Sequence, residues 1–211
     1  MKRSIFFVLL TFIVLGCSEA PPTIDQVDWR IVYRDNGFRY EELMLFMRVS
    51  DPDDDEDPNE VTVIAQDTGF LWKFERNEWT QIDRDGTTWW GMPGMIPYSG
   101  STLPNALYKV ILKDLAGQTV ETSFRLNSSR PQIFSIKWPT VNIENNRLSY
   151  SGSYSNPLLI LRAENHSMLS KTRANNGYVI QNADAVWWEI WISLTDSGNG
   201  IRLGPYRLAG K

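Results

Sequence analysis

Residues 108–117 of the chain read Tyr108-Lys109-Val110-Ile111-Leu112-Lys113-Asp114-Leu115-Ala116-Gly117. Tyr108, Val110 and Leu112 occupy every second position, and Lys109, Ile111 and Lys113 stand between them. Because successive side chains of a strand point to opposite faces of a sheet, this period of two predicts a half-buried β-strand. The Asp and Gly that follow are typical of the tight turn at its end.

The same period of two recurs on both sides of this stretch. Apolar residues alternate with other residues over 43–49, 61–65, 70–75 and 120–126, and clusters rich in Asp, Gly, Pro and Asn separate these segments. No stretch after residue 17 has the spacing of an amphipathic helix. The chain is therefore predicted to be all-β, with antiparallel strands.

Two stretches resemble immunoglobulin-like sandwiches, the broad group that includes fibronectin type III modules. One is 108–117, and the other is Val49-Ser50-Asp51-Pro52-Asp53-Asp54-Asp55, which is similar to the turn after an early strand of such modules. The resemblance implies a β-sandwich over residues 24–126, with Tyr108 as a tyrosine corner. It carries no information about activity, because such sandwiches serve many functions.

Residues 127–131 (Asn-Ser-Ser-Arg-Pro) have the composition of a linker. Further strands are expected beyond it, over 132–138, 147–151, 158–163, 178–181, 186–194 and 201–208, and a turn at 197–200 joins the last two as a hairpin. We therefore predict two small antiparallel β-sandwich domains, an immunoglobulin-like one at 24–126 and a second all-β domain at 131–211.

The start of the chain predicts export. Lys2-Arg3 precedes an apolar run over 5–14, and Val14-Leu15-Gly16-Cys17 follows. The run is shorter than the roughly 20 residues that span a bilayer, and it has the length of a signal-peptide core. These residues resemble a bacterial lipoprotein signal peptide that ends in a lipobox.

The lipoprotein resemblance implies removal of residues 1–16 as the signal peptide. It implies a diacylglyceryl group on the sulfur of Cys17 and an acyl chain such as palmitate on its new amino group. Residues 17–23 would then be the lipidated Cys and a short tether. Ser18 differs from the Asp that marks retention at the inner membrane, so the resemblance favours the outer membrane.

Net charge and composition limit the classes of partner that the chain is expected to bind. The formal net charge is −4, and it becomes −6 once cleavage removes Lys2 and Arg3. An acidic chain without a basic cluster argues against nucleic acid and against electrostatic attachment to anionic lipid, which leaves the lipid anchor as the membrane contact. Cys17 is the only cysteine and His166 the only histidine, so His-pair and His-triad zinc sites are excluded.

Nine tryptophans are many for 211 residues, and two pairs of them are candidates for binding a protein or glycan partner. In 186–194 one face is wholly apolar, and the other, which we expect to point outward, contains Trp187, Glu189, Trp191 and Ser193. Trp187 and Trp191 would lie about 13 Å apart, at 3.3 Å per residue. The alternatives for this pair are an interdomain contact and burial at a rim. Trp89 and Trp90 begin a Gly- and Pro-rich stretch that we expect to be a loop, with an apolar flap as the alternative.

An acidic run, Asp51-Pro52-Asp53-Asp54-Asp55-Glu56-Asp57-Pro58, has two interpretations. It departs from the EF-hand pattern, which has Gly at position 6 and Glu at position 12. We favour a solvated loop without a cation. The alternative is a weak calcium site formed by Asp51, Asp53, Asp55 and Asp57. No other cofactor is expected.

No nucleophile, zinc-protease, dinucleotide or P-loop motif is present. We therefore expect a non-enzymatic, membrane-anchored envelope lipoprotein with a binding or structural role. One alternative is a carbohydrate- or peptidoglycan-binding module that uses exposed tryptophans. The other is a hydrolase with an Asp/Glu pair, which requires two acids about 5–9.5 Å apart.

Overall fold

The computed structural model describes residues 20–51, 58–194 and 199–210, and within these ranges the chain is all-β, as predicted. Helical structure in the described residues is limited to two short 3-10 turns, η1 (Arg76–Glu78) and η2 (Ile133–Ser135). The strands are β1 (Thr23–Asp35), β2 (Arg39–Ser50), β3 (Pro58–Ala65), β4 (Phe70–Glu75), β5 (Thr80–Arg84), β6 (Thr87–Gly91), β7 (Leu107–Asp114), β8 (Thr119–Arg125), β9 (Thr140–Glu144), β10 (Arg147–Ser151), β11 (Leu158–Arg162), β12 (Met168–Arg173), β13 (Trp187–Ser193) and β14 (Gly200–Arg207).

One eight-stranded sheet contains strands from both halves of the chain, in the order β12-β11-β13-β14-β1-β2-β6-β5. At its centre β1 pairs with β14 in parallel, with Val32 opposite Gly200 and Asp35 opposite Leu203. The expectation of purely antiparallel strands is wrong at this pair, because alternation within a strand defines its faces but not its neighbours. The division into units at 24–126 and 131–211 stays a prediction, and this sheet connects the two.

A four-stranded sheet, β4-β3-β7-β8, packs on one face of the eight-stranded sheet and forms the predicted sandwich. We call this covered side the core face. Across it Trp29 of β1 stacks on Phe124 of β8, with 5.3 Å between the ring centroids. The side chains that fill the sandwich come from alternate strand positions, as expected, and are fully buried: Ile31, Tyr33, Leu43, Leu45, Met47, Val61, Val63, Val110 and Leu112.

Tyr108 lies at the start of β7 in this core. Its hydroxyl donates a hydrogen bond to the carbonyl oxygen of Pro104, four residues upstream, at 3.0 Å. This is the contact expected of a tyrosine corner, and it holds the chain that enters β7. Burial raises the pKa of the Tyr108 phenol well above its usual range.

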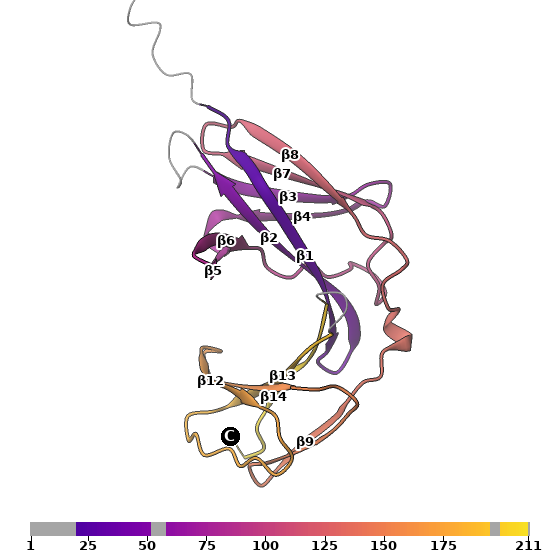
Figure 1. Cartoon of the computed structure of the whole chain (residues 1–211), viewed down its shortest axis with the longest axis vertical. Helices are drawn as coiled ribbons and strands as arrows, with labels where there is room; N and C mark the ends of the chain where they lie inside the picture. Colours follow the sequence, from indigo (N-terminus) through magenta and orange to yellow (C-terminus); the bar gives the residue numbers. More distant parts are fainter. Residues whose placement is uncertain (1–19, 52–57, 195–198, 211) are drawn as a thin grey trace, which may run out of the picture.

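The β9–β10 hairpin lies on the same side of the eight-stranded sheet, with Val141 and Ile143 near Trp188 and Leu203. Figure 1 shows that the sheet bends, so that the chain has a C-shaped outline. The four-stranded sheet and β9 lie on the outer side of the bend, and the sheet's ends, β5–β6 and β12, lie at its opening. Among the described strands, none forms a second layer on the opposite face, which we call the inner face.

Three expected segments differ from the structure. Trp89 and Trp90 belong to β6, paired with Ile82 and Met47, and only the chain after Gly91 is irregular. Residues 132–138 contain the turn η2 in place of a strand. Residues 178–181 form a single bridge, between Val179 and Arg147. In each case the availability of a pairing strand decided the outcome, which local sequence does not reveal.

Candidate functional site

The inner face carries a row of charged side chains that crosses five neighbouring strands. Strand order and register place these side chains side by side, and we call the row the charge ladder. From β11 to β2 its members are Arg162, Glu189, Arg202, Arg34 and Glu42.

Glu189 is the most buried member of the ladder, with 1% of its surface exposed. Its Oε1 accepts a hydrogen bond from Nε of Arg162 at 2.7 Å. Its Oε2 accepts from Nε of Arg202 at 2.8 Å and lies 2.7 Å from Nη2 of the same guanidinium. The alternating pattern of residues 186–194 predicts Glu189 on an outward polar face. The face is correct, but Glu189 is buried because arginines on both neighbouring strands cover its carboxylate.

Glu42 is the second carboxylate of the ladder and forms its end on β2. Its Oε2 lies 3.1 Å from Nε of Arg34, and both side chains are largely buried. The carboxylate occupies the space directly above Gly94, where any Cβ would overlap it. The absence of a side chain at Gly94 therefore makes room for the Arg34–Glu42 ion pair.

Two arginines stand next to each other in the middle of the ladder. Arg34 and Arg202 are register partners in the parallel pair β1–β14. Burial, followed by the positive charge of Arg34, lowers the pKa of the Arg202 guanidinium. Like charges directly opposite each other destabilise a sheet, so the repulsion between these two guanidinium groups must be offset by nearby negative charge.

A second group of arginines lies further along the inner face, near β5 and β6. Asp28 accepts from Arg84 at 2.7 Å and from Arg30 at 3.3 Å. Both guanidinium groups lie over the ring of Phe46, at 4.1 Å for Arg84 and 5.7 Å for Arg30. A surface depression of about 440 Å³ adjoins them, with Arg48, Thr87 and Trp89 in its lining. The inner face is thus rich in arginine on a chain that is acidic overall.

The first predicted tryptophan pair lies on this inner face. Trp187 and Trp191 are half-buried in β13. The ring of Trp187 stacks on His166 at 5.0 Å, and the guanidinium of Arg207 lies 5.4 Å from its centroid. Trp191 lies against Gly200, where an added Cβ would come within 2.9 Å of the indole. Intramolecular contacts therefore engage both rings.

The second predicted pair, Trp89 and Trp90, points to the two faces of β6. Trp89 is buried on the inner face, with the guanidinium of Arg84 at 4.9 Å. Trp90 is half-buried, and the guanidinium of Arg76 lies 3.6 Å above its ring. The two rings do not form a single surface.

Most of the residues proposed to bind calcium lie outside the residues that the structure describes. Asp51 is buried directly after β2, while Asp53, Asp55 and Asp57 lie outside the described residues, as does Cys17. Within the described ranges, no group of three or more His, Cys, Asp and Glu side chains has metal-binding geometry. No helix in those ranges is long and apolar enough to cross a membrane.

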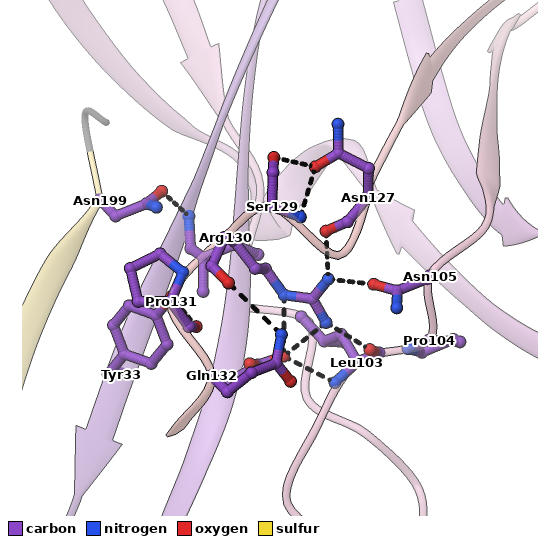
Figure 2. Close-up of polar contacts among 12 residues, drawn as sticks. Tyr33, Leu103, Pro104, Asn105, Asn127, Ser129, Arg130, Pro131, Gln132 and Asn199 are labelled. Carbon is purple, nitrogen blue, oxygen red and sulfur yellow. Dashed lines mark hydrogen bonds and ion pairs between the residues drawn. The ribbon is translucent and has the colours of Figure 1, made fainter. Parts of the chain in front are cut away.

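A buried ion pair on the core face, between Arg130 and Glu41, was not predicted from the sequence. Figure 2 shows Arg130 and its polar contacts. Glu41 has no exposed surface, and its Oε2 accepts from Nη2 of Arg130 at 3.0 Å and from the amide of Leu103 at 2.9 Å. Arg130 also donates to the carbonyl oxygens of Leu103, at 2.7 Å, and Asn127, at 2.8 Å, and to the side chain of Asn105.

The arrangement around Arg130 fastens the predicted linker to β2. The sequence predicts a linker over residues 127–131, and nothing within that segment indicates that Arg130 is buried. The signal that was present lies in β2, where Glu41 shares its face with Leu43, Leu45 and Met47. A charge in an otherwise apolar row indicates a buried partner.

Comparisons with known proteins add little to this geometry. No protein-family model matches the chain, and no curated protein matches it. Among solved structures, Tp47, the 47-kilodalton lipoprotein of Treponema pallidum, is similar over 89% of this chain and 51% of its own, at 12% identity and a TM-score of 0.33. The chain thus spans about half the length of that structure, and a similarity this distant supports no transfer of fold or activity.

Proposed function

We propose that this chain is a lipid-anchored protein of the bacterial envelope, located at the outer membrane, with a non-catalytic role in binding or structural interaction. The anchor rests on the sequence Val14-Leu15-Gly16-Cys17 and on the short apolar run before it. Several acyl chains give durable attachment, at about 0.8 kcal/mol per buried methylene. Ser18 in place of an Asp retention signal supports the outer membrane.

The observation that carries the binding role is the inner face of the eight-stranded sheet. An antiparallel sheet face that lacks a second layer usually presents separate solvated side chains. Here the side chains are held in fixed positions by ion pairs and by aromatic contacts, as with Glu189 and Phe46. A preorganised surface of this kind loses little conformational entropy when a partner binds.

The geometry favours binding over hydrolysis. A glycosidase-type reaction needs two carboxyl groups directed at a common substrate space. The buried carboxylates Glu41 and Glu189 and the largely buried Glu42 instead direct oxygens to arginine side chains, at 2.7–3.1 Å. Glycan stacking on Trp187 is also disfavoured, because His166 and Arg207 already contact its ring.

The anchor is tested by fractionation. Native protein should carry acyl mass on Cys17 as the mature N-terminus, and it should be recovered with the outer membrane. A Cys17→Ser chain should lose membrane partitioning. Recovery of that variant in membranes at the wild-type level would contradict the proposed anchor.

The inner face is tested by photo-crosslinking in cells. A photoreactive residue at Thr87, on the inner face, should yield a discrete higher-mass product. The same residue at Lys73, an exposed position of β4 in the four-stranded sheet, serves as the matched control and should yield none. Equal products from both positions, or none from Thr87, would refute an interaction role for this face.

A further inference from the structure

We propose that Arg34 and Arg202 bind a small oxyanion, a phosphate or carboxylate group, between them. This site goes beyond the envelope role proposed above, because it names the chemistry of a ligand and does not depend on the lipid anchor.

The charge ladder alternates in sign except at one step. Reading from β11 to β2, its charges are positive, negative, positive, positive and negative, so the interruption falls between Arg202 and Arg34. The five side chains together carry one uncompensated positive charge. A buried charge without a counterion is strongly unfavourable, and an anion at this step would restore both alternation and neutrality.

Arg34 has an unused donor at this step. The residue is 7% exposed, its Nε lies against Glu42, and its Nη2 lies 3.4 Å from the carbonyl oxygen of Gly204. Its Nη1 is buried and has no hydrogen-bond partner among the described residues. A water molecule would satisfy the donor but would leave the excess charge in place.

The second guanidinium provides the other half of the site and the way in. Arg202 contacts Glu189 through Nε and Nη2, and a quarter of its side chain is exposed. Burial, followed by the positive charge of Arg34, lowers the pKa of the Arg202 guanidinium, which is consistent with two neighbouring cations at this step. Because Arg34 is enclosed, the ligand must be small and must enter from the side of Arg202.

Paired guanidinium groups determine the class of ligand. Their planar N–H donors match the oxygens of phosphate and carboxylate, and they bind these groups more strongly than they bind chloride. Inorganic phosphate and acetate are therefore the two probes, and comparing them distinguishes a phosphate from a carboxylate ligand.

The test is thermal unfolding of the full chain in detergent, with each probe compared with chloride at equal ionic strength. At ten times its dissociation constant, the effective probe should raise the melting temperature by about 3–6 °C. Isothermal titration should show one saturable site per chain. No shift and no saturable heat with either probe would overturn the proposal.

Two matched variants locate the site. Arg202→Met should abolish the response to the probe, because it removes one of the two guanidinium groups. Arg125→Met removes an exposed arginine of β8, outside the ladder, and should keep the response. A full response in Arg202→Met, or equal loss in both variants, would overturn the proposal. If a variant fails to fold, titration of the wild-type chain alone decides the matter.

Discussion

Replacing Arg130 with Met should destabilise the protein more than any change to an exposed charge. Arg130 is 9% exposed, and its guanidinium joins Glu41 to two backbone carbonyl groups. Met keeps much of the side-chain length but removes the charge and every donor. Glu41 would then remain fully buried with the amide of Leu103 as its hydrogen-bond donor.

The expected loss follows from this burial. Removing one partner of a buried ion pair costs about 3–5 kcal/mol, because it leaves an uncompensated charge. In a protein of this size each kcal/mol lowers the melting temperature by about 2–4 °C, so the melting temperature should fall by about 6–20 °C. Arg125→Met, at an exposed position of β8, is the matched control and should change the free energy of unfolding by less than about 0.5 kcal/mol.

Urea unfolding followed by tryptophan fluorescence measures these free energies. A double variant, Glu41→Leu with Arg130→Met, separates the ion pair from simple packing. It should be more stable than the sum of the two single losses predicts, by about 1–3 kcal/mol. A loss below about 1 kcal/mol in Arg130→Met, or strict additivity in the double variant, would refute the reasoning.

Three further predictions concern other parts of the molecule. Gly94→Ala should cost about 1–3 kcal/mol in urea unfolding, because its Cβ would displace the Glu42 carboxylate, and an unchanged stability would contradict the packing described. Burial raises the pKa of Tyr33 and Tyr206 to about 12. Their phenols in the unfolded chain ionise near pH 10, so the stability they contribute is complete below that pH and declines as the pH rises from about 10 to 12. Urea titrations across this range should show the decline, with a shallower slope in Tyr33→Phe. Calcium at 1 mM should move the melting temperature by less than about 3 °C relative to chelator, and a larger shift that disappears in Asp53→Asn would favour the calcium site.

Much of the architecture could be predicted because it depends on local pattern. Alternation over residues 108–113 placed Tyr108, Val110 and Leu112 in the core, and the structure confirms all three as buried. The same reasoning assigned Trp188, Ile190 and Ile192 to an apolar face, and all three are buried. A strand's two faces are set by its own residues, so no knowledge of its neighbours is needed.

The candidate site could be predicted only in part. Trp187 and Trp191 are predicted to point outward, and they lie on the inner face of the sheet, but the pattern does not predict the arginines that accompany them. Arg34, Arg162 and Arg202 come from three separate strands, and each resembles an ordinary solvated charge in its own segment. They become neighbours in one row only because β1 and β14 pair in parallel and bring distant segments of the chain into register.

The sequence by itself determined the all-β class, the strand faces, the tyrosine corner and the expectation of a lipid anchor at Cys17. These features depend on residues close together in the chain, where side-chain alternation and turn chemistry act directly. Only the tertiary structure decided the joining of both halves in one sheet, the Arg130–Glu41 ion pair and the order of charges in the ladder. These features depend on which distant strands become neighbours and in what register, and this choice is made by the packing of the whole chain.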